Sequence, residues 1–577
     1  MRTNLSKHSD FKIATIVFVV TLCACFFSSY WPEFTRHTEA DRALIGLEMW
    51  SDKDFLVPHL LGDSYLTKPP FFYWMVALSY GLFNSLAEWV PRFPNTLLLS
   101  TLLFAQYIFL RKMNWTKELS VLSVLILGTC GMFFTNSNAE IDSAFTALTT
   151  LGLFASFLSL SNSRSLLWPI LAGVIISCAI LTKGPQPMFF LSVGTMVYYI
   201  SILRSSNSTK RELICFFRNR IVEWGIIILI LAMWIYILSK AVGSEILWYN
   251  FNTEIFSRLR ISDSQIHSNK PILFYVGALL VGMLPWSFAL LGFLKNTAAK
   301  KKFESLYIYS AALLFIGLVV FSFSSAKASR YLFPLYPWAA IFLCYPAIHF
   351  KTEKNLLILK SFLLFLGCIC GISALVFCVY LWAKVDIILI VCGAIVLLAL
   401  SIFTLSTARN LSSWNSGVLL LVLLLVLFRV PYALLVDGYR NEIKSVKPLV
   451  AKIDHLVPKN EPIYVVELLE RWIAYYLIEQ DRQVFRISPA KAKEIMNSEN
   501  AAFIYLILNE DEENWRVDQL KKVGISTSIL MREKAGNHFF LLVKAPLNAA
   551  EAINPKEIYP TIPSEPYPAQ EITHSQL

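Results

Sequence analysis

Residues 12–31 read KIATIVFVVTLCACFFSSYW, and this run carries no charge after its opening lysine. About twenty apolar residues suffice to cross the hydrocarbon core of a bilayer as one helix. The run lacks a clear small-x-small cleavage site, so we interpret it as a retained membrane helix rather than a signal peptide. This stretch therefore predicts a membrane protein whose chain leaves the bilayer near Trp31.

Similar apolar runs recur along the chain. Hydrophobic residues make up 56% of the sequence and charged residues 16%, a balance typical of polytopic membrane proteins. We interpret thirteen runs as spans, at 12–31, 93–110, 119–136, 143–160, 165–182, 186–203, 222–241, 271–294, 305–324, 331–349, 356–382, 385–406 and 415–436. The ten Cys lie between Cys23 and Cys392, and we interpret them as apolar packing residues rather than a disulfide framework.

The basic residues decide the topology. They cluster in alternate loops, at 111–117, 204–220, 295–302 and 351–354, which the positive-inside rule places in the cytoplasm. Counting the aromatic run 70–87 as a fourteenth span would put most clusters outside, so we expect it to lie on the outer membrane face. The basic residues behind the net charge of +11 therefore lie largely in the inner loops. The sequence has no basic patch interleaved with aromatic residues, so nothing in it suggests nucleic-acid binding.

Three parts follow from this topology. Residues 1–436 form a transmembrane domain in which 32–92 is one long outer loop with interfacial helices. From 437 to 548, short β-rich runs at 462–467, 483–487, 502–508, 528–533 and 538–544 alternate with helical patterns at 471–480, 490–498 and 512–523, which predicts an outer α/β domain. Residues 549–577 are rich in Pro and polar residues, which is typical of a disordered tail.

Ionisable residues from five loops converge on the predicted outer face, where their burial at span ends makes them candidates for function. They include Glu39, Asp41, Arg42, Tyr65, Lys68, Glu140, Asp142, Lys183, Glu254, Arg258, Arg260, His267, Lys327, Arg330 and Tyr331. Ordinary structural explanations stay open. Glu39 and Asp41 suit a helix start, Asp142 suits an N-cap, and the cations suit snorkelling or lipid headgroups.

One stretch resembles a known family. TEADRALIGLEMWSDKDFLVPHLLGDSYLTKPPFFYWMVALSYGLF, at 38–83, resembles the first periplasmic loop of the aminoarabinose (lipid A) transferases. More broadly it resembles the polyprenyl-phosphate-dependent mannosyltransferase-like group of type C membrane glycosyltransferases. Further matches are AEIDSAF at 139–145, LTKGP at 181–185, LPWS at 284–287 and SRYLFPLYP at 329–337. The resemblance covers about residues 10–436.

The resemblance implies a fold and a function. The fold is a polytopic α-helical membrane protein of about 13 transmembrane helices, with a C-terminal periplasmic α/β domain. The function is inverting transfer of a sugar, 4-amino-4-deoxy-L-arabinose or a related one, from an undecaprenyl-phosphate carrier to a periplasm-facing acceptor, lipid A first. We expect a monomer in the bacterial inner membrane, with 32–92 as its periplasmic catalytic loop and its C-terminus also periplasmic.

The resemblance also implies roles for residues. Glu39, Asp142 and Asp41 are the candidate catalytic carboxylates, and Lys68 is the first candidate to bind the donor phosphate. Lys183, Arg258, Arg330, Tyr65 and His267 are further candidates for that phosphate site. Aromatic residues at 71–74 and an apolar groove beneath the first loop are expected to hold the polyprenyl chain.

The chain departs from the family pattern at the first loop. Thr38 replaces the first acid of the family's acidic pair, and Asp41 occupies a position where Arg is common. Thr67 stands where the family often has a Glu that, with a loop His, can hold a metal ion. We therefore predict no metal and no cofactor.

Other functions stay open. The acceptor could be a protein or another glycan, and a flippase or polymerase of lipid-linked sugars would also be polytopic with basic inner loops. A transporter places polar residues in mid-membrane, whereas this chain concentrates them at one face. A non-catalytic scaffold would not need five loops of opposed charges.

Overall fold

The computed structural model describes most of the chain. The described residues are 2–30, 32–34, 37–131, 138–161, 165–204, 210–252, 270–288, 290, 305–324, 327–349, 353–381, 387–428, 431–466, 471–487, 503–509, 528–535 and 538–546. Contacts within the chain divide it into two compact units. A helical unit holds 1–33, 68–237 and 261–442, and a second unit holds 34–67, 238–260 and 443–577.

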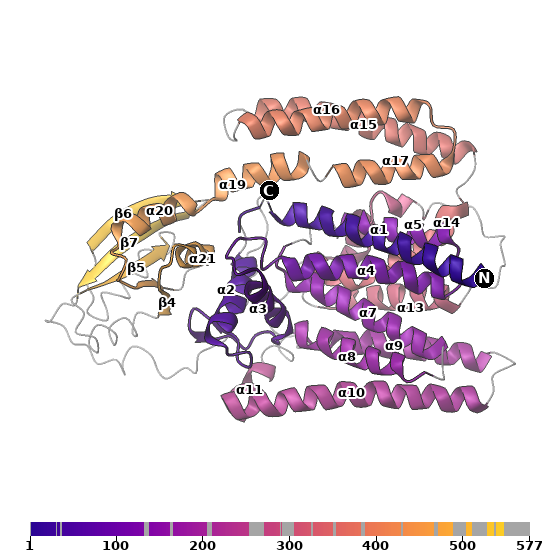
Figure 1. The fold of residues 1–577 in the computed structure, drawn as a ribbon, viewed down its shortest axis with the longest axis horizontal. Coiled ribbons are helices and arrows are strands. Elements are labelled where there is room, and N and C mark those ends of the chain that lie inside the picture. Colours follow the sequence, from indigo (N-terminus) through magenta and orange to yellow (C-terminus); the bar gives the residue numbers. More distant parts are fainter. Residues whose placement is uncertain are drawn as a thin grey trace. The chain divides into compact units, whose positions relative to one another are not determined.

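Each of the thirteen predicted spans overlaps with a helix (Figure 1), although the described helix within 271–294 has only nine residues. Among the described residues, eight helices are long and apolar enough to cross a membrane. The helices at the predicted spans are α1 (Arg2–Tyr30), α4 (Phe93–Lys112), α5 (Lys117–Gly128), α7 (Ile141–Ser161), α8 (Leu167–Lys183), α9 (Gln186–Arg204), α10 (Lys210–Val242), α12 (Phe274–Gly282), α13 (Ser305–Ser322), η3 (Ser329–Leu335) with α14 (Tyr336–His349), α15 (Glu353–Leu381), α16 (Ile387–Arg409) and α17 (Trp414–Leu427).

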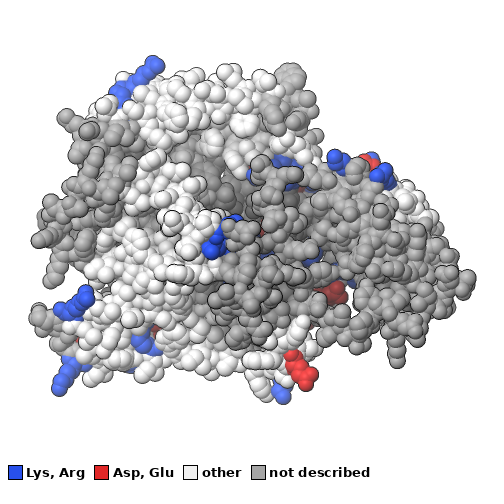
Figure 2. All heavy atoms as spheres, turned by 180° about the vertical axis from the view of Figure 1, so that it is seen from behind, with Lys and Arg blue, Asp and Glu red and all other residues white. Residues whose placement is uncertain are grey.

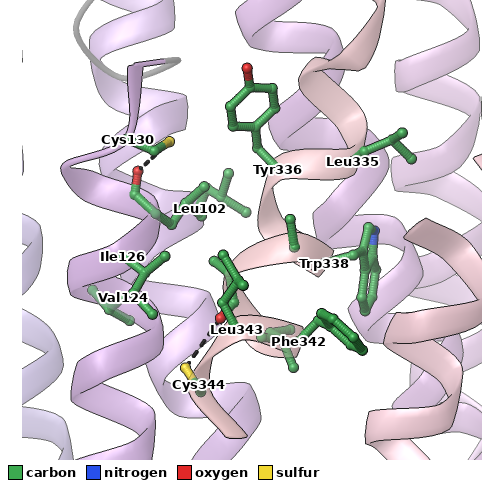
Figure 3. Close-up of a cluster of buried hydrophobic side chains, with 14 of the residues drawn as sticks. Leu102, Val124, Ile126, Cys130, Leu335, Tyr336, Trp338, Phe342, Leu343 and Cys344 are labelled. Carbon is green, nitrogen blue, oxygen red and sulfur yellow. Dashed lines mark hydrogen bonds between the residues drawn. The ribbon is translucent and has the colours of Figure 1, made fainter. Parts of the chain in front are cut away.

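The helical unit is a bundle with a continuous apolar core. Helix α4 packs against α1, α5 and α7, while α14 packs against α5 and α13. Figure 3 shows part of the core between α4 and α5 on one side and η3 and α14 on the other, where Leu102 and Ile126 lie opposite Trp338 and Leu343. Trp338 is fully buried, so its large ring fixes the spacing of the helices around it.

The outside of the bundle is apolar as well. Large side chains on α10 and α15 are exposed, for example Ile221 and Val379. Figure 2 shows a broad uncharged surface over this unit, with most of its few charged side chains basic. Such a surface suits a lipid environment, because apolar faces of this size are rare on monomeric soluble proteins. The chain is a multi-pass membrane protein.

Helix α10 differs from the expectation at its start. Residues 204–220 were expected to form a basic loop before a span at 222–241, but α10 already begins at Lys210. Arg220, which we expected in that loop, is buried and forms an ion pair with Glu223, and its Nη1 donates to Ser156 Oγ of α7 at 2.7 Å. The charge pattern did not predict that Arg220 is buried, because such a pattern does not reveal which helix supplies the partners of a cation.

The second unit combines part of the first loop with a sheet. The loop supplies α2 (His37–Asp52) and the hairpin of β1 (His59–Leu60) and β2 (Asp63–Ser64). The sheet has the order β4-β3-β5-β7-β6, with β3 parallel to β4 and β5, and β7 antiparallel to β5 and β6. Its elements are α20 (Lys447–Leu456), β3 (Ile463–Val466), α21 (Trp472–Glu479), β4 (Val484–Ile487), β5 (Phe503–Asn509), β6 (Ser528–Ala535) and β7 (His538–Pro546).

The predicted strands of this unit are all present, and the helix expected at 471–480 is α21. The helices expected at 490–498 and 512–523, and the tail from 549, lie outside the described residues. The division into units cuts the expected outer loop 32–92 after Thr67. Its remainder contains α3 (Phe71–Phe83), a helix of 13 residues, which is shorter than a span.

Candidate active site

Helix α8 ends in a glycine turn that presents Lys183. Gly184 follows this last helical residue with a φ of +125°, and its N–H donates to the carbonyl of Ile180 at 2.8 Å. A residue with a side chain rarely adopts this φ, so the glycine of LTKGP fixes where the helix stops. Lys183 thereby stands at the negative end of the α8 dipole.

Lys183 forms an ion pair with Asp142. The lysine Nζ contacts Asp142 Oδ1, and the two side chains are 16% and 12% exposed. Helix α7 begins at Ile141, so Asp142 lies in its first turn, where a carboxylate also interacts favourably with the helix dipole. The lysine ammonium lies 4.9 Å from the ring centroid of Tyr331, which adds a cation–π contact.

A second cation joins this cluster from η3. The guanidinium carbon of Arg330 lies 5.8 Å from the ring centroid of Tyr331. Burial acts to lower the pKa of Arg330, but Asp142, Tyr331 and Glu140 outweigh it, so the pKa is raised. The structure therefore brings together Asp142, Lys183 and Arg330, three of the residues that the sequence analysis selected from three different loops.

Asn95 of α4 fixes the turn that leads into Asp142, and the sequence analysis missed it. The side chain is fully buried, and its Nδ2 donates to the carbonyls of Asn138 at 2.6 Å and Glu140 at 2.8 Å. A buried amide is expected to have such partners because leaving it unpaired costs about 1–3 kcal/mol. The available signal was an Asn at the start of an apolar run, which also suits an ordinary helix start.

Lys68 and α3 also belong to the helical unit. Lys68 is half-buried and precedes the N-cap of α3, Pro70, by two residues. The expectation that aromatic residues 71–74 line a lipid groove needs correction, because Phe72 and Tyr73 are fully buried in the core. The exposed stripe of α3 is instead formed by Phe71, Trp74, Leu78 and Leu82, which recur at helical spacing.

Glu39 and Asp41 lie on α2 in the second unit. Both are nearly fully buried, with 2% and 4% of their surface exposed. Asp41 Oδ2 accepts a hydrogen bond from Arg471 Nη1 at 2.7 Å and lies 3.9 Å from Arg42 Nη1. Arg471 stands 430 residues along the chain from Asp41, and nothing in the sequence pattern pointed to it.

The hairpin that carries Tyr65 is tied to α2 by Glu48. Glu48 Oε1 accepts from the Leu61 N–H at 2.5 Å, and Oε2 accepts from the Gly62 N–H at 3.2 Å. Leu61 and Gly62 have φ values of +54° and +85°, so the turn needs this support. Burial raises the pKa of Glu48, although hydrogen bonds from Gly62 and Leu61 act to lower it.

Several expectations stay predictions. Arg258 and His267 lie outside the described residues, so the predicted absence of a metal ion also stays untested. Glu39 and Asp41 belong to one unit, whereas Lys68 and Asp142 belong to the other. That all four face one cavity is therefore still a prediction.

Comparisons with known proteins agree with the sequence resemblance. Residues 15–248 match the family model described as dolichyl-phosphate-mannose-protein mannosyltransferase. An uncharacterized protein of Aquifex aeolicus (strain VF5) is 28% identical over 328 residues, which are 56% of this chain and 62% of that protein. This chain thus matches less than two thirds of that relative's length.

A named relative aligns over more of the chain. The undecaprenyl phosphate-alpha-4-amino-4-deoxy-L-arabinose arabinosyl transferase of Enterobacter sp. (strain 638) is 25% identical over 453 residues, or 74% of this chain and 78% of that protein. The crystal structure of ArnT from Cupriavidus metallidurans bound to undecaprenyl phosphate aligns with a TM-score of 0.68 and 17% identity, covering 94% of this chain and 99% of that one.

The structural likeness confirms the predicted fold, a type C glycosyltransferase bundle followed by a C-terminal sheet-containing part. The name of the Enterobacter relative and the description of the family model both denote glycosyltransferases that use polyprenyl-phosphate sugar donors, in agreement with the sequence resemblance. In sequence and in fold, the chain is similar to the aminoarabinose transferase-like group of type C membrane glycosyltransferases.

Proposed function

We propose that the chain transfers a sugar from an undecaprenyl-phosphate carrier to an acceptor on the periplasmic side of a bacterial inner membrane. Lipid A is the first candidate acceptor, and 4-amino-4-deoxy-L-arabinose or a related sugar is the candidate cargo. The observation that carries this proposal is the cluster of Lys183, Arg330 and Asp142 where α7, α8 and η3 meet. The naming of the relative from Enterobacter supports the choice of donor and sugar.

The cluster suits the leaving group of this reaction. As the acceptor oxygen bonds to the anomeric carbon, the bond from that carbon to the phosphate oxygen breaks, and undecaprenyl phosphate departs with the electron pair. Fixed cations stabilise the charge that develops on the phosphate. Lys183 would exchange the carboxylate of Asp142 for the phosphate, while Arg330 supplies a second charge. Lys68, Arg258, Tyr65 and His267 are the further proposed contacts.

The candidate carboxylates would serve the acceptor. A sugar hydroxyl acceptor requires a general base, and Glu39 is the first candidate, with Asp142 and Asp41 behind it. A lipid A phosphate is already largely ionised near neutral pH, since its second pKa is about 6. With that acceptor, the carboxylate would orient the phosphate or stabilise positive charge on the sugar.

The exposed stripe of α3 is the proposed contact for the polyprenyl chain. Phe71 and Trp74 are half-buried, while Leu78 and Leu82 are 61% and 71% exposed. The stripe lies on the helix that follows Lys68, so a carrier phosphate near this lysine would leave its tail beside α3.

Mass spectrometry of lipid A tests the proposal. Cells with the gene should contain lipid A heavier by one sugar than cells without it, and purified protein with an undecaprenyl-phosphate sugar should perform the same transfer. Unmodified lipid A in both assays would rule out lipid A as the acceptor.

A protein acceptor is the second candidate, and the family model favours it because its description names a protein mannosyltransferase. In that case lipid A stays unchanged and a secreted protein gains a hexose.

The variant Glu39→Gln distinguishes a transferase from a flippase or polymerase of lipid-linked sugars. It should abolish sugar transfer, whereas a transporter with this change would keep moving its lipid. The periplasmic position of the site and the monomeric state are part of this proposal.

A further inference from the structure

We propose that the C-terminal part of the chain holds the catalytic-loop helix α2 in place, with Arg471 acting as a positioning residue through Asp41. The inference rests on the proposed function, because its consequence is the placement of Glu39. It gives the C-terminal sheet-containing part a role in the reaction. It also assigns Asp41, a candidate acid in the sequence, to attachment rather than to chemistry.

The ion pair between Arg471 and Asp41 is the first support. Arg471 Nη1 lies 2.7 Å from Asp41 Oδ2, and the side chains are 21% and 5% exposed. Within the described part of the chain, the other oxygen of Asp41, Oδ1, is buried without a hydrogen-bond partner. The buried charge of Asp41 therefore depends mainly on Arg471. Removing one member of a mostly buried pair is damaging, because the other charge stays behind uncompensated.

An aromatic contact beside this pair is the second support. Arg471 is the N-cap of α21, and Tyr475 and Tyr476 lie one turn further along the same helix. Phe34, just before α2, packs edge-on against Tyr475 with ring centroids 4.7 Å apart, and its N–H donates to Tyr476 Oη at 3.0 Å. All three rings are almost fully buried. Helix α21 therefore contacts the first loop both before and within α2.

The hairpin provides a third attachment. Arg486 of the edge strand β4 donates its N–H to the Leu61 carbonyl at 3.3 Å, and its Nη1 lies 3.9 Å from Asp63 Oδ2. An edge strand presents unpaired backbone groups, and here β4 uses one of them on the hairpin. Since Glu48 binds the same hairpin to α2, the loop is held from α21 at one end and from β4 at the other.

This attachment bears on Glu39 rather than directly on the substrate. Glu39 and Asp41 are two residues apart on α2, and helix positions i and i+2 do not share a face. Arg471 can therefore occupy Asp41 while Glu39 points elsewhere. A rotation or shift of α2 would still move Glu39, and a displacement of about 1 Å at a catalytic group can lower a rate by about a hundredfold.

Charge reversal distinguishes a positioning role from a catalytic one. We expect Asp41→Arg to lower kcat by about a hundredfold, because two guanidinium groups would then face each other, and Asp41→Asn to lower it by about tenfold. The double variant Asp41→Arg with Arg471→Asp should regain at least a tenfold increase over Asp41→Arg alone. KM for the lipid-linked donor should change less than kcat, since Lys183 and Arg330 are untouched.

Hydrogen exchange supplies a readout that does not need activity. Amides of residues 37–67 should exchange faster in Asp41→Arg and Arg471→Ala than in the wild type, and at the wild-type rate in the double reversal. Lys452→Ala is the matched control, because Lys452 of α20 forms a more exposed ion pair with Glu533 of β6 in the same unit, 2.8 Å apart. It should change neither kcat nor the exchange of 37–67.

Two results would overturn the inference. If the double reversal restores wild-type exchange but no activity, Asp41 takes part in the chemistry itself. If exchange at 37–67 is the same in all variants, Arg471 does not hold α2. Absence of transfer by the wild type with every donor would instead contradict the proposed function, while the exchange data would still decide whether the attachment exists.

Discussion

The contacts of Lys183 support its proposed role in binding the donor phosphate. The glycine turn after α8 sets its position, Asp142 balances its charge, and the Tyr331 ring lies beneath its ammonium group. A lysine that only snorkels to the membrane surface would not need an acidic partner on a neighbouring helix. The ion pair with Asp142 therefore indicates that Lys183 is positioned to bind an anion.

We expect Lys183→Ala to lower transfer by about a hundredfold or more, because the leaving phosphate loses a fixed charge. Lys183→Arg should retain more activity, since it keeps the charge but changes its geometry. The measurement is the initial rate with purified protein in detergent. Lys112→Ala is the control, as that lysine stacks on Trp168 at the opposite end of α8 from Lys183 and should leave the rate unchanged. Full activity of Lys183→Ala would move the phosphate site to Lys68.

For individual residues, the sequence could identify candidates for the active site but not the partners with which they pair. Asp142, Lys183 and Arg330 stood out because ionisable groups are rare at the ends of apolar runs. Asn95 and Arg471 did not stand out, because their partners are distant in sequence and their residue types are common. Asp41 was selected as an acid, yet its ion pair with Arg471 shows that a buried carboxylate can equally well serve as an attachment.

Helix ends depend on a few buried arginines. Arg92 is fully buried and donates from Nη1 to the carbonyls of Ser29 at 2.8 Å and Pro32 at 2.5 Å, and from Nη2 to Glu33 at 3.4 Å. It thereby satisfies carbonyls at the C-terminal end of α1, where the first loop starts. Arg482 does the same for the end of α20, with the carbonyls of Asp454, Val457 and Pro458.

We expect Arg92→Lys to lower the thermal midpoint and Arg92→Ala to lower it further. An ammonium is a compact charge that cannot reproduce the fork of a guanidinium, and each unsatisfied buried carbonyl costs about 1–3 kcal/mol. Unfolding followed by fluorescence in detergent measures the effect. Arg204→Lys, at the exposed end of α9, is the matched control and should leave the midpoint unchanged. An Arg92→Ala protein that unfolds at the wild-type midpoint would contradict this role.

Glu48 makes the stability of the first loop depend on pH. Burial raises its pKa above the unfolded value of 4.5. An acid with a raised pKa binds its proton more tightly in the folded state, so its contribution is present below pH 4.5 and is lost as the pH rises through the folded pKa. The midpoint of the wild type should therefore fall relative to Glu48→Gln as the pH increases from 4 to 8. A difference that moved the opposite way would mean that the two backbone hydrogen bonds outweigh burial.

At the scale of elements, composition predicted the helices well and their ends less well. Apolar runs coincide with helices because backbone groups inside a bilayer must bond within their own segment. The start of α10 was misplaced by twelve residues, since the polar stretch from Lys210 is helical but not apolar. Helices were expected within 32–92, but the hairpin of β1 and β2 was not, because it depends on distant contacts such as the one with β4.

For the whole molecule, the topology derived from loop charges is the claim with the widest consequences. Helix α10 has 33 residues and is therefore about 50 Å long, more than the roughly 30 Å of the hydrocarbon core. Its first turns carry Lys210, Arg211 and Arg218, so the excess length is basic and suits the cytoplasmic side. With thirteen spans, we expect the C-terminal part on the opposite side, in the periplasm, together with the first loop.

Reporter fusions test this topology. Alkaline phosphatase fused after residue 577 should be active, because the enzyme matures only in the periplasm, and the same reporter inserted within 205–209 should be inactive. A green fluorescent protein at the two positions should give the reverse pattern. The argument for the C-terminal site is structural as well as electrostatic: Arg471 and Asp41 belong to one unit, so both must lie on the same side of the membrane. An inactive C-terminal phosphatase would contradict the thirteen-span topology with a cytoplasmic N-terminus. It would also move the first loop, with Glu39, to the cytoplasmic face, where a periplasmic acceptor cannot reach it.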